Sequence, residues 1–224
     1  MNSAAMLVSI PGLSMTGATP IVFVVDDDVS VRESLEQLIE TAGWHPQIFS
    51  SAEEFLTRPR QTIPNCLILD VGLPDLNGLD LQRRVSGDRT EMPIIFITGQ
   101  GDIPTTVQAM KGGAIEFLTK PFQPELLLSS IRCAIDRSRQ SLAEAEKIRE
   151  LRRRYETMRV REREVMALVV KGQLNKQVGA ELGISEITVK AHRGRMMRKM
   201  RARSLPDLVN MAARLRLTVA DADC

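Results

Sequence analysis

Short apolar runs alternate with amphipathic stretches along the first 135 residues of the chain. The runs are IVFVV (21–25), PQIFS (46–50), CLILD (66–70), PIIFIT (93–98) and AIEFL (114–118). Most of them are apolar on both faces, as the buried strands of a parallel sheet are. Apolar positions with helical spacing fill residues 30–43, 51–58, 78–85 and 103–113. This alternation predicts a doubly wound α/β domain, in which ligands bind at the carboxyl ends of the strands.

Helical periodicity continues beyond this domain. One long helix is expected from residue 124 to residue 158, because no Gly or Pro follows Pro124 there. Four short helices are expected over residues 161–172, 175–182, 185–200 and 204–217. The long helix carries an apolar stripe at spacings of three or four, formed by Leu142, Ala145, Ile148, Leu151, Tyr155 and Met158. Such a stripe either pairs with a partner helix or lies on the chain's own domains.

The two halves of the chain carry opposite charge. Residues 1–136 hold 9 Lys and Arg against 17 Asp and Glu, a net charge of −8, whereas residues 137–217 hold 21 against 9, a net charge of +12. A strongly basic helical half indicates contact with a polyanion such as nucleic acid. Solvated basic helices are the alternative explanation of the same charge.

The chain offers no sign of a membrane or of secretion. No run approaches the about 20 apolar residues of a membrane span. The first 20 residues contain no basic residue and are broken by Pro11 and Gly12, so they do not predict a signal peptide, and Met15 is an alternative start. Three cysteines without metal-site spacing fit a reducing compartment. We therefore expect a cytoplasmic protein with a flexible arm over residues 1–20.

Carboxylates follow two of the predicted strands. Asp26, Asp27 and Asp28 follow the first strand, and Asp70 ends the third. Because neighbouring parallel strands end at the same edge of a sheet, these carboxylates should converge. Mg²⁺ prefers oxygen ligands and would offset their repulsion. The alternative is that they form turns and caps, Asp28 in particular capping the helix that begins near residue 30.

Two further strand ends add to the cluster. Thr98 ends the fourth strand with a hydroxyl group, and Lys120 brings an ammonium group just past the fifth. Carboxylates, a divalent ion, a hydroxyl group and an ammonium group together suit phosphoryl transfer, in which one carboxylate attacks and the cations offset the charge of the phosphoryl oxygens. Asp70 is the candidate nucleophile because it stands alone at its strand end.

The segments IVFVVDDDVSVRESL, LILDVGLPDLNGLDL, PIIFITGQGD and GAIEFLTKPF resemble the receiver domain of response regulators over residues 20–135. The resemblance implies that a histidine kinase phosphorylates Asp70. It implies further that Thr98 and Lys120 contact the phosphoryl group. Mg²⁺ would be bound by Asp26, Asp27, Asp70 and the carbonyl of Gly72. Phe117 occupies the position of an aromatic that rotates on phosphorylation, although a core strand residue explains it equally well.

Residues 175–200 have the pattern of a helix-turn-helix, with a capping serine at Ser185 and a basic second helix. REREV, NKQVGAELGIS, TVKAHR and SLPDLV resemble the LuxR type of this motif, and the whole chain resembles the FixJ/NarL group. The resemblance implies base contacts by Lys190, Ala191, Arg193, Gly194 and Arg195, and phosphate contacts by Lys176 and Arg198. It implies dimerisation through the last helix, by Leu205, Leu208, Val209 and Met211, which on the alternative view only complete the domain core.

Two positions depart from that pattern. Met158 and Arg159 stand where relatives have a Leu-Thr pair that caps the first helix, so the long helix is expected to run straight on. Gly179 stands where relatives have Ala, which predicts a cost of about 0.5–1 kcal/mol in helix stability.

These observations predict a receiver domain over residues 21–136, a linker helix over 137–158, a helix-turn-helix domain over 159–217 and a tail over 218–224. The expected function is a transcription factor, not an enzyme, that forms a homodimer on phosphorylation of Asp70 and binds double-stranded promoter DNA. One alternative is a Mg²⁺-dependent phosphatase of the haloacid dehalogenase type, with its nucleophile on the first strand. The other is a DNA-binding regulator that works without phosphorylation.

Overall fold

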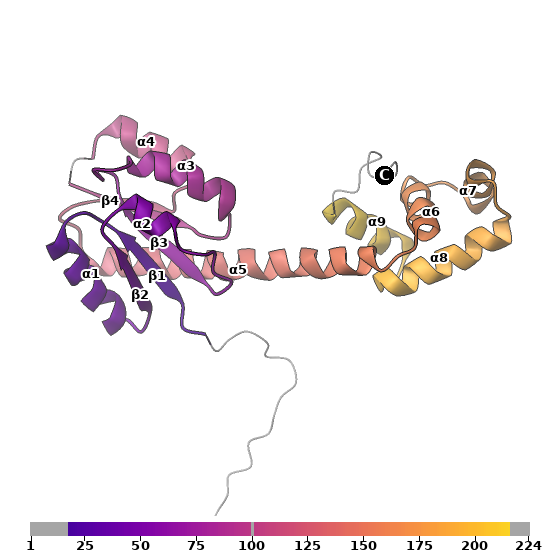
Figure 1. The fold of residues 1–224 in the computed structure, drawn as a ribbon, viewed down its shortest axis with the longest axis horizontal. Coiled ribbons are helices and arrows are strands. Elements are labelled where there is room, and N and C mark those ends of the chain that lie inside the picture. Colours follow the sequence, from indigo (N-terminus) through magenta and orange to yellow (C-terminus); the bar gives the residue numbers. More distant parts are fainter. Residues whose placement is uncertain (1–17, 100, 216–224) are drawn as a thin grey trace, which may run out of the picture. The chain divides into compact units, whose positions relative to one another are not determined.

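The computed structural model describes residues 18–99 and 101–215. Gln100, the tail over residues 218–224 and all but the last three residues of the predicted arm lie outside the described residues. The chain divides into two compact units, with the division between Leu142 and Ala143. Each unit is described by itself below. The helices and strands are numbered in chain order, and Figure 1 labels them except for β5.

The first unit is built on a parallel sheet of five strands in the order β2-β1-β3-β4-β5. The strands are β1 (Ile21–Val25), β2 (His45–Phe49), β3 (Asn65–Asp70), β4 (Ile94–Thr98) and β5 (Glu116–Thr119). All five predicted strands are thus confirmed, with shifts of one or two residues at most ends. The register pairs Val25 with Leu69, so that Asp26 and Asp70 follow paired positions at the same edge of the sheet.

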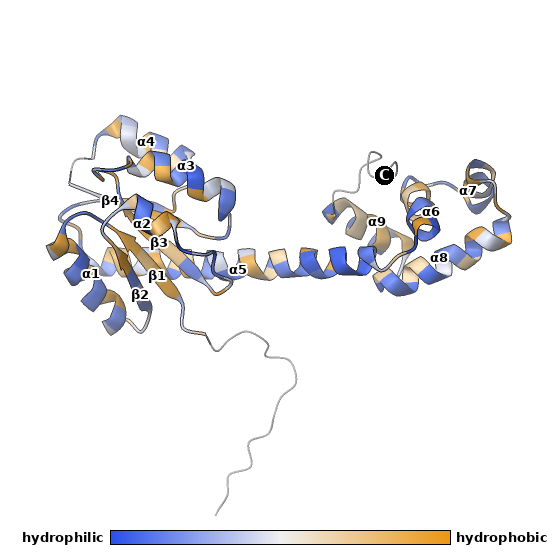
Figure 2. Ribbon diagram, in the orientation of Figure 1, coloured by the Kyte–Doolittle hydropathy of each residue, from blue (hydrophilic) through white to orange (hydrophobic). Residues whose placement is uncertain are grey.

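Helices cover both faces of this sheet. The helices α2 (Ala52–Leu56), α3 (Gly78–Asp88) and α4 (Ile103–Lys111) pack on one face, whereas α1 (Val29–Thr41) and the first part of α5 (Pro124–Glu156) pack on the other. Figure 2 shows the strands between them as predominantly hydrophobic. The doubly wound fold is therefore confirmed.

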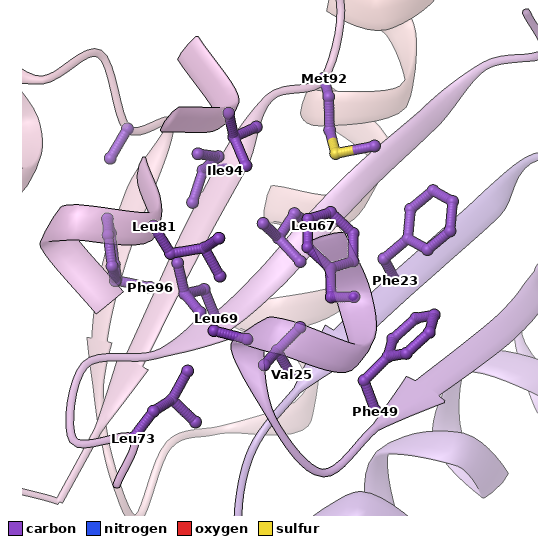
Figure 3. Close-up of a cluster of buried hydrophobic side chains, with 14 of the residues drawn as sticks. Phe23, Val25, Phe49, Leu67, Leu69, Leu73, Leu81, Met92, Ile94 and Phe96 are labelled. Atoms are coloured by element: carbon purple, nitrogen blue, oxygen red, sulfur yellow. The ribbon is translucent and has the colours of Figure 1, made fainter. Parts of the chain in front are cut away.

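Aromatic side chains fill the core on the α2 side. Figure 3 shows Phe23 of β1 and Phe49 of β2 near each other in this core. Phe55 of α2 completes the group, with its ring centroid 5.7 Å from that of Phe23 and 5.6 Å from that of Phe49. Burial of each such side chain contributes about 1.5–3 kcal/mol relative to exposure. Aromatic packing therefore fixes the short α2 against the two strands that precede it.

The second unit contains α6 (Val160–Val170), α7 (Asn175–Leu182), α8 (Glu186–Met200) and α9 (Leu205–Arg214). Ser185 caps α8 as predicted, since its hydroxyl oxygen accepts the backbone N–H of Thr188 at 3.2 Å. Val189, Met196 and Met200 are buried and form one face of α8 against the core of the unit. The end of α5 joins that core through Leu151 and Tyr155. Among the described residues, no helix has both the length and the apolar composition to cross a membrane.

The long helix does not run into α6 as the sequence suggested. The α5 helix ends at Glu156, and α6 begins at Val160 with Arg159 as its capping residue. The backbone N–H of Arg159 donates to Oε2 of Glu162 at 2.9 Å, so a carboxylate of the first turn of α6 satisfies it. Met158 is buried between the two helices' ends in the core of the unit.

Two cationic side chains donate hydrogen bonds to backbone carbonyl groups at this helix break. The guanidinium group of Arg163 donates to the carbonyl oxygens of Met158 at 3.1 Å and Glu156 at 3.0 Å. Nζ of Lys199 donates to the carbonyl oxygen of Thr157 at 2.8 Å. Since carbonyl groups at a helix end lack partners within the helix, these contacts stabilise the break. The expectation of a continuous helix was wrong because side chains of α6 and α8 stabilise the break, and the pattern within the long helix does not describe them.

Gly179 of α7 has a packing role that helix propensity alone does not predict. A Cβ atom at this position would lie 2.7 Å from the carbonyl oxygen of Ile184, in the turn that joins α7 to α8. The same turn is closed by a hydrogen bond of 3.0 Å from the Ile184 N–H to the Gly179 carbonyl. The glycine therefore permits close approach of the turn, instead of only weakening the helix.

We expect Gly179→Ala to lower the free energy of unfolding of the second unit by about 1–3 kcal/mol, because the added methyl group must displace the turn. Hydrogen exchange of the α7 and α8 amides would measure the loss. Ala180→Gly, at an exposed position of the same helix, is the matched control and should cost about 1 kcal/mol through helix propensity alone. A stabilised Gly179→Ala variant would contradict the steric explanation.

Candidate functional site

Three carboxylates converge at the carboxyl edge of the sheet. Oxygen atoms of Asp26, Asp27 and Asp70 all lie within 4.8 Å of one another. Asp26 and Asp70 are buried, whereas Asp27 is exposed. The strand order explains the meeting, because β1 and β3 are neighbours and end in register. The structure thus brings together the acidic residues that the sequence predicted.

Lys120, the residue after β5, contacts two of these carboxylates. Its Nζ atom donates to Oδ2 of Asp26 at 2.6 Å and to Oδ2 of Asp70 at 2.8 Å. The Lys120-Pro121 peptide bond is cis. Although burial disfavours the ammonium ion, the hydrogen bonds to Asp26 and Asp70 outweigh it and raise the pKa of Lys120. Burial raises the pKa of Asp26, and the contact with Lys120 only partly opposes this.

The backbone orients the remaining carboxylate oxygens. Oδ1 of Asp26 accepts the N–H of Asp28 at 2.9 Å, and Oδ1 of Asp70 accepts the N–H of Gly72 at 3.1 Å. Asp28 itself caps α1 by accepting the N–H of Ser30 at 2.8 Å, as the alternative explanation of this residue predicted. The acidic run therefore divides, with Asp26 and Asp27 in the cluster and Asp28 at the helix end.

Gly78 is a residue of this site that the sequence did not single out. It begins α3, and its N–H donates to the carbonyl oxygen of Val71 at 3.0 Å. A Cβ atom at position 78 would overlap the carbonyl oxygen of Asp70 and lie 3.0 Å from Cα of Val71. Only glycine allows the loop after β3 to return this closely to the strand end. The Asn-Gly step in LPDLNGLD was the available signal.

Thr98 and Phe117 lie at the next two strands of the sheet. Thr98 is buried at the end of β4, and Phe117 is half-buried on β5 with its ring centroid 6.1 Å from that of Phe96. Both lie near Gly101 in the loop before α4, since a Cβ atom added there would lie 3.2 Å from Cε1 of Phe117 and 3.5 Å from Cγ2 of Thr98. The β4–α4 loop therefore adjoins both the hydroxyl residue and the aromatic ring.

The cluster has the donor set of a magnesium site. Lys120 pairs with two of the three carboxylates, and the guanidinium group of Arg32 donates to the backbone carbonyl of Asp26 at 2.7 Å. Three carboxylates against these two cations leave negative charge that a divalent cation would offset. All the ligand atoms are oxygen, which suits a hard divalent cation, and the exposure of Asp27 leaves the site open to the waters that Mg²⁺ retains. The residues present fit the ion that the sequence suggested.

In the second unit, α8 presents a basic face opposite its buried one. The exposed residues of this face are Lys190, Ala191, Gly194, Arg195 and Arg198. Lys176 of α7 is also exposed. Lys190 makes an exposed ion pair of 3.3 Å with Glu186, one turn earlier on the same helix. Within the described part of the chain, the cations of this face form no other ion pair, so they are accessible to solvent or to a ligand.

Two other cations of α8 are occupied within the unit. Arg193 is half-buried and donates to Oδ1 of Asn175 at 2.7 Å, which ties α8 to the start of α7. Lys199 forms an ion pair of 2.6 Å with the buried Glu162. The family resemblance placed Arg193 among the base contacts, but the structure separates it and Lys199 from the exposed face.

Comparison with known proteins accounts for both units. Residues 22–132 match the family model of the response regulator receiver domain, and residues 158–212 match that of bacterial regulatory proteins of the luxR family. Nodulation protein W of Bradyrhizobium diazoefficiens is 49% identical over 195 residues, which cover 87% of this chain and 86% of that protein. The chain belongs to the response regulators.

Full-length relatives share this response regulator's architecture. The transcriptional regulatory protein FixJ of Rhizobium meliloti is 38% identical, with 85% of this chain and 94% of that protein covered. Among solved structures, the response regulator StyR superimposes with a TM-score of 0.73 at 42% identity, covering 88% of this chain and 99% of that one. The chain is thus a FixJ-like response regulator with a receiver domain and a LuxR-type DNA-binding domain.

The four residues of α9 that the sequence assigned to dimerisation lie in two different environments. Leu208 is fully buried in the second unit, and Met211 packs against the same core. Leu205 and Val209 are each 37% exposed. For Leu208 and Met211 the structure supports the alternative expectation of a core role, whereas Leu205 and Val209 remain accessible to a second copy of the response regulator.

Proposed function

We propose that a sensor histidine kinase phosphorylates this response regulator on Asp70, and that the phosphorylated chain forms a homodimer that binds promoter DNA. The observation that carries the proposal is the contact of Lys120 Nζ with Oδ2 of both Asp26 and Asp70. Such a contact holds the Asp70 carboxylate in place for attack. A chain that acts on the chromosome works in the cytoplasm, to which we assign it.

In the proposed reaction, a carboxylate oxygen of Asp70 attacks the phosphorus atom of a phosphohistidine. The new P–O bond forms as the P–N bond breaks, and the imidazole nitrogen leaves with the electron pair and takes up a proton. Lys120 offsets negative charge on the transferred group. Asp26, Asp27, Asp70 and the carbonyl of Gly72 would hold Mg²⁺, which supplies further positive charge next to the phosphoryl oxygens when it is bound.

The proposed switch follows from the added charge. The hydroxyl group of Thr98 turns toward the phosphoryl oxygens, and Phe117 moves inward, which alters the surface of α4 and β5. That surface suits a dimer, since α4 exposes Ile103, Val107 and Met110 at spacings of four and three. Leu205 and Val209 of α9 extend the proposed contact between copies, so that two α8 helices reach inverted half-sites.

Within each half-site, α8 is proposed to enter the major groove. Lys190, Ala191, Gly194 and Arg195 would approach bases, and Lys176 and Arg198 would contact phosphates. Arg193 would act on bases only if it left Asn175, so we propose that it positions α8. The boundaries proposed for the receiver domain, linker helix and DNA-binding domain are 21–136, 137–158 and 159–217.

The test treats the purified chain with acetyl phosphate, once with Mg²⁺ and once with EDTA. We expect one phosphoryl group per chain with Mg²⁺ and almost none with EDTA, measured by intact mass. Light scattering should show a dimer only after phosphorylation. Affinity for a duplex selected from a random pool should rise about 5–150-fold, the usual range of allosteric coupling. Unchanged affinity and oligomeric state would support a regulator that works without phosphorylation.

A further inference from the structure

The first turn of α8 exposes a large apolar side chain. Ile187 is 80% exposed, and it belongs to none of the three hydrophobic clusters formed by the described residues. Isoleucine also lacks the negative charge that is favourable in the first turn of a helix, so helix formation gives no reason for it. Neither the core nor the helix explains this residue.

Ile187 lies on the proposed DNA-binding face. Residues 190, 191, 194 and 198 follow it at spacings of three, four, seven and eleven, which places all five on one side of a helix. The buried face, marked by Val189, Met196 and Met200, lies on the other side. Ile187 therefore begins the row of exposed residues that Lys190, Ala191, Gly194 and Arg198 continue.

The side chains along this row differ in size. Ala191 carries one methyl group and Gly194 none, and the space around a Cβ atom at Gly194 is open for 4 Å. The helix backbone can therefore approach a surface closely in the middle of the row, with Ile187 projecting at one end. Lys190, Arg195 and Arg198 supply positive charge around it. The matching ligand is a polyanion that carries an apolar group on a recessed surface.

Duplex DNA has one such group. The C5 methyl group of thymine is the apolar feature of the major-groove floor, and the first residues of a recognition helix are those that reach base edges. A protein partner with an apolar patch would have to bury the surrounding cations of α8, which the charge of this face disfavours.

We propose that Ile187 packs against the thymine methyl group in the major groove and thereby selects thymine at one position of each half-site. This inference rests on the proposed function, because it requires α8 to bind duplex DNA. It assigns a specificity role to a residue that has no polar group, on a face where the family resemblance pointed only to Lys190, Ala191, Gly194, Arg195 and Arg198.

The test first selects a high-affinity duplex from a random pool with the full-length, phosphorylated chain. Each thymine is then replaced singly by deoxyuridine, which removes the methyl group and keeps the base pair. At one position per half-site, replacement of thymine by deoxyuridine should lower the affinity of the chain for the duplex about fourfold. Burial of one methyl-sized group contributes about 0.8 kcal/mol, which corresponds to this factor. Ile187→Ala should weaken binding to the unmodified duplex and should no longer distinguish thymine from deoxyuridine there.

Two variants sharpen the result. Ile187→Val keeps a branched apolar side chain and should keep most of the preference for thymine. Val160→Ala removes an apolar side chain that is 70% exposed on α6 and should change neither affinity nor preference. If Ile187→Ala retains the full preference for thymine, or if no thymine is sensitive in the unsubstituted chain, the inference is wrong although the chain binds DNA. Failure to enrich any duplex would contradict the proposed function, and this inference with it.

Discussion

Asp70→Asn is expected to reduce the incorporation of phosphate from acetyl phosphate and Mg²⁺ to background. A carboxamide is a far weaker nucleophile than the carboxylate, and it removes one negative charge from the contacts that Lys120 makes at 2.6 and 2.8 Å with Asp26 and Asp70. In this variant, treatment with acetyl phosphate should change neither the affinity for DNA nor the oligomeric state. Intact mass and the site of the acyl phosphate after borohydride reduction and peptide mapping would measure the outcome.

The matched control is Asp28→Asn, at an exposed residue of the same acidic run that caps α1 through Ser30. Asparagine is an equally good capping residue, so this variant should accept phosphate at nearly the normal level. A phosphoryl group found on Asp26 would instead support the phosphatase alternative, in which the nucleophile stands on the first strand. Full phosphorylation of Asp70→Asn would contradict the proposed acceptor.

The second large effect is expected from Glu162→Gln in the DNA-binding unit. Glu162 is only 1% exposed, and its carboxylate accepts from Lys199 at 2.6 Å and from the N–H of Arg159 at 2.9 Å. Removing one partner of a buried ion pair leaves the other without its counter-ion, although Lys199 retains some access to water. We expect the unit to lose about 2–3 kcal/mol of unfolding free energy at pH 7.

This loss should depend on pH. Burial acts to raise the pKa of Glu162, but the hydrogen bonds from Lys199 and the Arg159 N–H outweigh it and lower the pKa below the usual 4.5. A lowered pKa in the folded state stabilises the protein above the unfolded pKa, and this contribution is lost as the pH falls through the folded pKa. The difference between the natural chain and Glu162→Gln should therefore be complete at pH 7 and shrink below about pH 4.5.

Hydrogen exchange of the α6 and α8 amides would report this unit separately from the receiver unit. Glu164→Gln is the control on the same helix, since its ion pair with Arg161 lies nearer to solvent and contributes about 0–1 kcal/mol. A loss that does not change between pH 7 and the acid range would show that shape, and not charge, explains the role of Glu162.

The carboxyl edge of the receiver sheet was predictable because few physical rules determine it. Apolar runs indicated five buried strands, and parallel strands of one sheet end at a common edge. Residues at or just past the carboxyl ends of strands, such as Asp26, Asp70 and Lys120, had to meet there. The exact contacts did not follow in the same way. That one ammonium group bridges both buried carboxylates depends on the path of the chain after β5, which periodicity does not describe.

The errors share one cause. The end of α5 is made by Arg163 and Lys199, and the role of Gly179 depends on the carbonyl of Ile184. Each involves a backbone group that packs against residues of another helix or turn. Propensities and spacing describe one helix at a time, so they misjudged the helix break and the glycine.

The membership of Leu151 and Tyr155 in the core of the second unit has a consequence for how this regulator can be divided. A fragment that starts at Arg159, where the DNA-binding pattern begins, leaves out both of these side chains and also Met158. It would expose the apolar surface that they cover. Gene fusions that exchange receivers between regulators of this kind should therefore join within α5, upstream of Leu151, so that each DNA-binding unit keeps its own last turns of that helix.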